Sequence, residues 1–300
     1  MDRYTLRDLI QDFGTTAQCL EFLRQRRWPG GIFCRKCETI TRHHLRISHK
    51  AYSCQNCGTM ISPTIGTILH RSKISLPDWM YTIYTLASTR TGVASAQISR
   101  ELGLGYKASL RMVNRIRACL EETHAPITGI AECDETYVGG KPRKRGVSKR
   151  GRGAKKTKVF AVVERGGVAT AKVVPNVQRA TLMPIIQEHV AEGATVYTDE
   201  FNVYAKLDEL GYKHDTVKHK ENEYVKYKEN GEVVHTNCAE GFFQSPKGAI
   251  RSVHRGVSDQ RMQGYWNEYC YRYSHRNDTG HMFFGIIDRI LEAPISAQAA

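Results

Sequence analysis

The sequence predicts an α/β core that follows a small metal-binding module and a helical region. Three observations support this prediction: two C-x2-C pairs near the N-terminus, a helix-turn-helix pattern after them, and a strand-rich pattern from Thr128 onward. The composition is that of a globular protein, with 41% hydrophobic and 25% charged residues. We expect a ribbon module at 1–72, a helical region at 73–124, the core at 125–292 and a frayed tail at 293–300.

The charge of the chain favours a polyanionic partner. The formal net charge is +14, and nucleic acid is the commonest partner of such a basic protein. A charge that serves solubility alone is the alternative. The N-terminus lacks the pattern of a signal peptide, and the apolar runs are far shorter than the roughly 20 residues of a membrane span. The sequence therefore predicts a cytoplasmic protein with no membrane partner.

The nine cysteines indicate bound metal rather than disulfides, because no export signal accompanies them. Four of them form two C-x2-C pairs with the separation of a zinc ribbon, although chance spacing is the alternative. Each pair makes a tight turn that directs two thiolates at one point. Four thiolates complete a closed tetrahedral site, which predicts a structural Zn2+ on Cys34, Cys37, Cys54 and Cys57.

Residues 92–117 predict a helix-turn-helix, with a turn at Gly103–Gly105 and a second helix that begins at Lys107 or Ala108. The second helix of this motif lies in the major groove of DNA. An ordinary helical hairpin is the alternative, but the basic second helix and the adjacent ribbon favour DNA contact. The expected exposed, base-reading side chains are Lys107, Ser109, Arg111 and Asn114.

The pattern changes to strands and helices after Thr128. The predicted strands cover 130–138, 158–164, 168–174, 194–200 and 213–217. The predicted helices cover 181–190, 202–210 and a segment from about Asn237. Three strands, a helix, a strand, a helix, a strand and a helix is the element order of an RNase H-like core.

Three acids meet at one edge of such a core: Asp134 on the first strand, Asp199 at the end of the fourth and Glu240 on the last helix. Clustered carboxylates repel each other unless a cation lies between them. Oxygen ligands suit Mg2+ or Mn2+, and two such ions about 4 Å apart can activate a water or a 3′-hydroxyl. Each acid alone would be an ordinary surface carboxylate. Strand phase alone favours Asp134 over Glu132 and Glu135.

The last predicted helix carries further polar residues on one face. Asn237 is a candidate metal ligand or orienting residue, and Lys247 a candidate contact for phosphate. Pro246 predicts a bend within this helix.

The run from Lys141 to Lys158 is basic and free of acids. A solvated loop is the alternative to a phosphate clamp, which the density of charge favours. The candidate DNA contacts there are Arg143, Lys144, Arg145 and Arg150.

The chain resembles bacterial insertion-sequence transposases of the DDE type that carry an N-terminal zinc ribbon, the ISXO2-like group of the retroviral integrase superfamily. The resemblance rests on the ribbon cysteines, Arg27-Trp28-Pro29, Gly66–Lys73, Asp134–Gly140, Thr198–Glu200, His235–Phe242, Lys247 and Tyr271–Arg276. It implies an integrase-like fold, metal-dependent cleavage at transposon ends and joining of the 3′-hydroxyl to target DNA. The implied partners are terminal inverted repeats, target DNA and further copies of the chain, as a dimer or larger.

The resemblance leaves two points open. Some members have an acid-acid-asparagine pattern, so Asn237 competes with Glu240, which the E-x6-K spacing to Lys247 favours. Phe243 and Pro246 stand where the family pattern has Trp and Leu. The alternatives are a catalytically inactive, transposase-derived DNA-binding protein and a structure-selective nuclease that cuts without joining.

Overall fold

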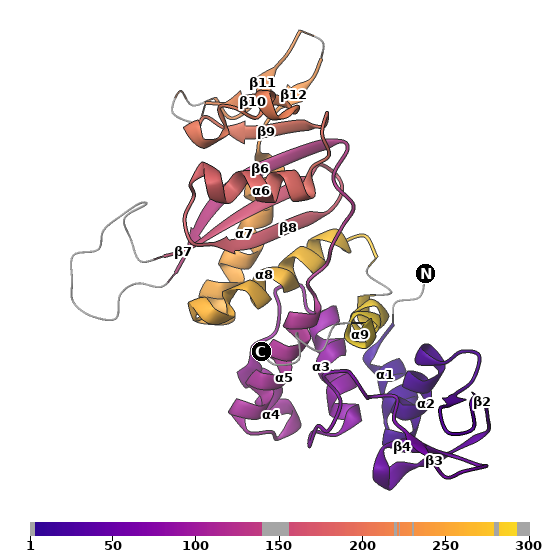
Figure 1. The fold of residues 1–300 in the computed structure, drawn as a ribbon. Coiled ribbons are helices and arrows are strands. Elements are labelled where there is room, and N and C mark those ends of the chain that lie inside the picture. The colour runs from indigo at the N-terminus through magenta and orange to yellow at the C-terminus, as the bar shows by residue number, and fades with distance from the viewer. Residues whose placement is uncertain are drawn as a thin grey trace. The chain divides into compact units, whose positions relative to one another are not determined.

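The computed structural model describes residues 4–139, 156–218, 221, 223–229, 231–278 and 282–292. The chain divides into two compact units, Met1–Leu120 with Asp278–Ala300, and Glu121–Asn277 (Figure 1). The second unit thus begins close to the predicted start of the core but ends at Asn277, because α9 (Met282–Glu292) packs with the first unit. Some predicted sites lie outside the described residues, namely Arg143, Lys144, Arg145, Arg150 and the tail at 293–300.

The first unit combines helices with the ribbon. Thr5 with Asp8, and Thr15 with Gln18, form capping boxes that start its first two helices. The C-terminal helix α9 packs against α3 and α5 and so completes the core of this unit. Its described helices are α1 (Leu6–Phe13), α2 (Thr16–Arg27), α3 (Leu76–Ser88), α4 (Ser95–Leu102), α5 (Tyr106–Cys119) and α9.

The ribbon is a pair of small antiparallel sheets. β3 and β4 form an antiparallel hairpin, and a third strand, β5, extends it. Tyr52 donates its hydroxyl hydrogen to Glu21 Oε2 at 2.8 Å, which links α2 to the ribbon. The strands are β1 (Phe33–Cys34) with β2 (Thr39–Ile40), and β3 (His43–Arg46), β4 (Ala51–Cys54) and β5 (Met60–Ile61).

The second unit is built on a mixed five-stranded sheet in the order β10-β9-β6-β7-β8. β6 pairs antiparallel with β7, which pairs antiparallel with β8, whereas β6, β9 and β10 run parallel. This sheet agrees with the RNase H-like core that the element order predicts. The strands are β6 (Ile130–Val138), β7 (Thr157–Glu164), β8 (Ala169–Val174), β9 (Thr195–Asp199) and β10 (Lys213–Val217).

Helices cover both faces of this sheet. Successive side chains of a strand point to opposite faces, so Phe160 on β7 packs with α6 and Ala161 packs with α7 and α8. Leu182 is fully buried in the core between the sheet and α6, and Trp266 is fully buried in the core between the sheet and the helices α7 and α8. The helices are α6 (Arg179–His189), α7 (Asn237–Ser252) and α8 (Asp259–Ser274).

The predicted helix at 202–210 is wrong. This segment forms two 3-10 turns, η2 (Asn202–Tyr204) and η3 (Asp208–Leu210). Tyr204 and Leu207 are fully buried, and the tight turns let both side chains reach the core within a short connection between parallel strands. The sequence also missed a small hairpin, β11 (Lys226–Tyr227) with β12 (Val233–Val234).

Candidate functional site

The register of β6 and β9 brings the first two predicted acids together. Glu132 pairs with Tyr197 in parallel register, so two residues further along Asp134 and Asp199 lie at the same level of the sheet. Both point to the face that α7 covers, because alternate residues of a strand share a face. The predicted convergence of strand acids therefore follows directly from this pairing.

The third acid, Glu240, is exposed on α7, and its negative charge acts on Asp134. Burial raises the pKa of Asp134 to about 8, and the negative charges of Glu135, Asp199 and Glu240 add to this rise. The Glu135 N–H donates to Asp134 Oδ1 at 2.7 Å and opposes the rise. Such a carboxyl gains greatly from a nearby cation, because a cation stabilises its charged form.

The three acids of β6 have three different environments. Glu135 points to the α6 face, where the buried hydroxyl of Tyr204 donates to its Oε2 at 3.0 Å. Glu132 shares the face of Asp134 but is fully buried in an ion pair with Arg165. Asp134 remains partly exposed among other carboxylates. Strand phase therefore does not distinguish Asp134 from Glu132, contrary to the prediction, because the two share a face. The ion pair of Glu132 with Arg165 is what distinguishes them.

Lys247 lies near the same carboxylates. Burial lowers the pKa of Lys247, while the charges of Asp134 and Glu240 act in the opposite direction. Its Nζ lies 5.2 Å from the ring centroid of Phe243, which is buried in the core. α7 remains helical through Pro246.

Asn237 is the first residue of α7 and its side chain is exposed. Its backbone N–H donates to His235 Nδ1 at 3.3 Å. Asn237 and Glu240 lie one helical turn apart, so both fit the predicted polar face of this helix.

The four ribbon cysteines fit Zn2+. Their Sγ atoms all lie within 4.8 Å of one another, and tetrahedral zinc with Zn–S bonds of about 2.3 Å requires sulfurs about 3.8 Å apart. Glu38 and Gly58, which follow the two pairs, both adopt left-handed backbone angles, with φ of 53° and 75°. These turns direct the thiolates inward, as the spacing predicts.

The described residues hold two groups of potential metal ligands whose ligand atoms lie within 4.8 Å of one another. They are the ribbon cysteines and Glu132 with His235 and Cys238. The carboxylates of Asp134, Asp199 and Glu240 form no third group of this kind in the described residues. Carboxylate oxygens are nonetheless the ligands that suit Mg2+ or Mn2+.

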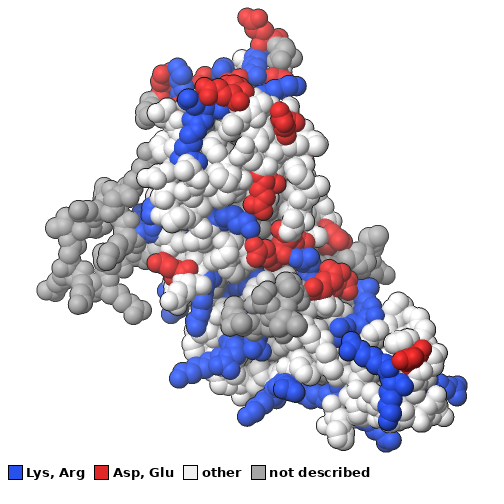
Figure 2. All heavy atoms as spheres, in the orientation of Figure 1, with Lys and Arg blue, Asp and Glu red and all other residues white. Residues whose placement is uncertain are grey.

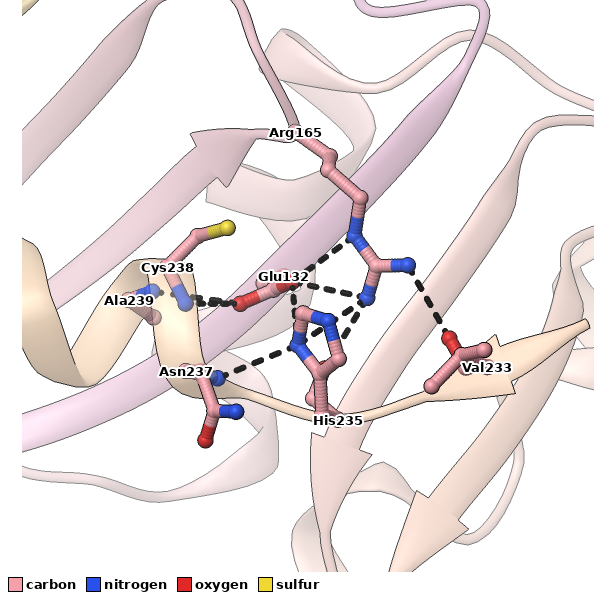
Figure 3. Close-up of polar contacts among 7 residues, drawn as sticks. All are labelled: Glu132, Arg165, Val233, His235, Asn237, Cys238 and Ala239. Carbon is pink, nitrogen blue, oxygen red and sulfur yellow. Dashed lines mark hydrogen bonds and ion pairs between the residues drawn. The ribbon is translucent and has the colours of Figure 1, made fainter. Parts of the chain in front are cut away.

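A network around Glu132 was missed by sequence reasoning (Figure 3). It contains Arg165, His235 and the start of α7, and it lies on the same face of β6 as Asp134. The signal that could have found it is the i, i+2 spacing of Glu132 and Asp134, which puts both on one face of a strand.

The two helices predicted for residues 92–117 are present in the first unit and are joined by a short turn. Gly103 adopts a left-handed conformation after α4, and α5 begins at Tyr106, one residue before its predicted start. Lys107 and Arg111 are exposed on α5, and Asn114 is partly exposed. The exposure expected for Ser109 is wrong. It is buried, and its Oγ donates to the Gly105 carbonyl at 3.4 Å.

The positive charge concentrates in this unit. Residues 1–120 hold 18 Lys and Arg against seven Asp and Glu. On the face drawn in Figure 2, most of the charged side chains of this unit are Lys and Arg. Within the described ranges, every helix is too short or too polar to cross a membrane.

A four-cysteine ribbon ahead of an α/β core with clustered carboxylates defines the class of zinc-ribbon DDE transposases. Residues 126–274 match the model of the ISXO2-like transposase domain, and residues 14–60 match the transposase zinc-ribbon domain. The chain belongs to the ISXO2-like transposase family.

Relatives agree with this assignment. The chain is 30% identical over 273 residues, 85% of its length, to an uncharacterized protein in transposable element ISH50 of Halobacterium salinarum, of which it covers 90%. An uncharacterized transposase-like protein of Haemophilus influenzae is 51% identical over 47 residues, which are 16% of this chain and 38% of that protein. Among solved structures, the Mos1 strand transfer complex aligns with a TM-score of 0.30 and 10% identity, over 70% of this chain and 76% of that chain.

Proposed function

We propose that this transposase cleaves phosphodiester bonds at the ends of its element and joins the freed 3′-hydroxyl to target DNA. The observation that supports the proposal is the pairing of β6 with β9, which brings Asp134 and Asp199 to the same level of the sheet. Burial, together with the charges of Glu135, Asp199 and Glu240, raises the pKa of Asp134 to about 8. Mg2+ or Mn2+ held by Asp134, Asp199 and Glu240 would supply charge stabilisation at the attacking and leaving oxygens. The substrate would be DNA of the nucleoid, so we expect the chain to act in the cytoplasm.

The other candidate residues take supporting roles in this proposal. Asn237 lies one turn before Glu240 and serves as an oxygen ligand or an orienting group. Lys247 lies beside Asp134 and Glu240, where its ammonium can hold a phosphate of the scissile strand. In the first unit, α5 contacts terminal-repeat DNA through Lys107, Arg111 and Asn114, and two copies or more bring two ends together.

Strand transfer in vitro tests the proposal. Wild type, Asp134→Ala and the control Glu188→Gln, an exposed acid of α6, are incubated with a labelled oligonucleotide of the element's end and a plasmid, with and without Mg2+. We expect joined product from wild type and Glu188→Gln with Mg2+, and none from Asp134→Ala. End-specific binding without cutting by any of the three would support the inactive DNA-binding alternative. Cutting without joining would support a nuclease.

A further inference from the structure

Glu132 lies fully buried at the start of α7, with both carboxylate oxygens engaged (Figure 3). Its Oε1 accepts from Arg165 Nη2 at 2.9 Å and from Arg165 Nε at 3.1 Å. Its Oε2 accepts from the backbone N–H groups of Cys238 at 2.7 Å and Ala239 at 3.2 Å. These N–H groups belong to the first turn of a helix, where they have no partner within the helix and where negative charge is favourable.

Arg165 and His235 extend this network to the segment that precedes α7. Arg165 Nη1 donates to the Val233 carbonyl at 3.0 Å, and its Nη2 lies 3.1 Å from His235 Nδ1. The same His235 nitrogen accepts from the Asn237 N–H at 3.3 Å. The network therefore ties β6, the end of β7, the chain at 233–235 and the first turn of α7 together.

This network is better suited to fixing the position of α7 than to binding a metal ion. Glu132, His235 and Cys238 offer potential ligand atoms within 4.8 Å of one another. The guanidinium of Arg165, however, already contacts Glu132 Oε1, and a fixed positive charge at that distance repels a metal cation.

We propose that Glu132 is a positioning residue for the metal centre of the transposase. It fixes the first turn of α7 to β6, and this sets where Asn237 and Glu240 lie relative to Asp134, two residues along the same face. The inference rests on the proposed function, because it assumes that Asp134 and Glu240 hold metal. Partners that orient metal ligands contribute about 10-fold to 100-fold in metal affinity, so we expect Glu132→Gln to weaken metal binding by that factor.

Mn2+ binding to the zinc-loaded, full-length chain, measured by calorimetry without DNA, tests this role. The proteins are wild type, Glu132→Gln, Asp134→Asn and the surface control Glu188→Gln. Zinc content and thermal unfolding establish that each variant is folded. If Glu132→Gln does not fold, Arg165→Lys is tested instead. This variant keeps the positive charge but loses the planar, two-pronged hydrogen bonding of the guanidinium, so we expect the same weakening of metal binding.

The expected result is wild-type affinity in Glu188→Gln, loss of binding in Asp134→Asn, and binding about 10-fold to 100-fold weaker in Glu132→Gln. Strand transfer by Glu132→Gln should recover at high Mn2+ concentration, which a merely structural role would not produce. Wild-type Mn2+ affinity in Glu132→Gln, even with a lowered Tm, would overturn the positioning role alone. Wild-type affinity in Asp134→Asn would overturn the metal centre itself, and this inference with it.

Discussion

Glu132 and Asp134 point to the same face of β6 but have opposite electrostatic environments. Glu132 lies against the guanidinium of Arg165 at 2.9 Å, so its charge is balanced by a permanent cation. Burial raises the pKa of Asp134 to about 8, and the charges of Glu135, Asp199 and Glu240 add to this rise. Two carboxylates on one strand are thus separated into a structural anion and a group that needs a removable cation.

The raised pKa of Asp134 makes the metal-free protein less stable at high pH. The folded pKa lies above the ordinary value of about 3.9, so the native state binds more protons than the unfolded state between about pH 4 and pH 8. Stability should therefore fall as pH rises through this window, and Asp134→Asn should remove that part of the loss. We expect Asp134→Asn to unfold at higher temperature than wild type at pH 8, by roughly 2–4 °C for each kcal/mol recovered.

Scanning calorimetry between pH 5 and pH 8.5, in buffers depleted of free divalent metal, measures this effect. Glu188→Gln serves as the control, because its acid is exposed on α6. Parallel profiles of Tm against pH for wild type and Asp134→Asn would show that Asp134 does not cause the loss of stability.

Metal binding at the carboxylate cluster should depend on pH. The carboxyl of Asp134 is protonated at neutral pH, so a bound Mg2+ or Mn2+ must displace its proton. The apparent affinity should rise by about tenfold per pH unit below pH 8 and level off above it. Calorimetric titration of Mn2+ at pH 6.5, 7.5 and 8.5 measures the slope. Glu135→Gln should lower the pKa of Asp134 and so flatten the dependence of Mn2+ affinity on pH. An unchanged dependence in that variant would count against Asp134 as the titrating group.

Glu240 and Asn237 should differ in their contribution to the metal centre. Glu240 carries a charge that acts on Asp134, whereas Asn237 offers a neutral oxygen one turn away. We expect Glu240→Gln to abolish detectable Mn2+ binding and strand transfer, and Asn237→Ala to reduce both by about 10-fold to 100-fold. Mn2+ titrations and strand-transfer assays of both variants measure this difference. The reverse order of severity would make Asn237 the third ligand.

The zinc ribbon should unfold when one thiolate is removed. Structural Zn2+ contributes apparent binding free energies of about 10–16 kcal/mol, and this energy folds the module. We expect Cys34→Ala to lose zinc and end binding, while Cys270→Ala, a cysteine of α8 outside the ribbon, keeps both. Metal analysis of the purified chains and a binding assay measure the outcome. Zinc retained by Cys34→Ala would assign the metal to another site.

Binding of DNA by α5 should appear in the salt dependence of the affinity. Removal of one phosphate-binding side chain lowers the slope of log K against log salt by about 0.9. We expect Lys107→Ala with Arg111→Ala to lower the slope by nearly two, since both side chains are exposed on α5. Arg7→Ala on α1, which is also exposed, should leave it unchanged. Binding isotherms at several salt concentrations measure these slopes, and equal slopes for all three proteins would exclude Lys107 and Arg111 from the phosphate contacts.

The sequence by itself determined the local features. Cysteine spacing fixed the ribbon, because two C-x2-C turns leave few ways to arrange four thiolates. Side-chain periodicity placed the five strands of the sheet and the helices α6 and α7. Periodicity failed at 202–210, where burial of Tyr204 and Leu207 imposed 3-10 turns, and at Ser109, whose polar side chain lies inside the helical region.

The tertiary structure decided what no local pattern contains. Strand phase separates Glu135 from Glu132 and Asp134 but cannot separate those two. Strand pairing together with the helices on each face gave the three acids different surroundings. The partners of Glu132 come from Arg165 and from the N-terminus of α7, far along the chain. Likewise, α9 belongs to the first unit because it packs against α3 and α5. Charge and burial depend on neighbours in space, so the roles of these acids emerge only when the sheet and α7 are assembled.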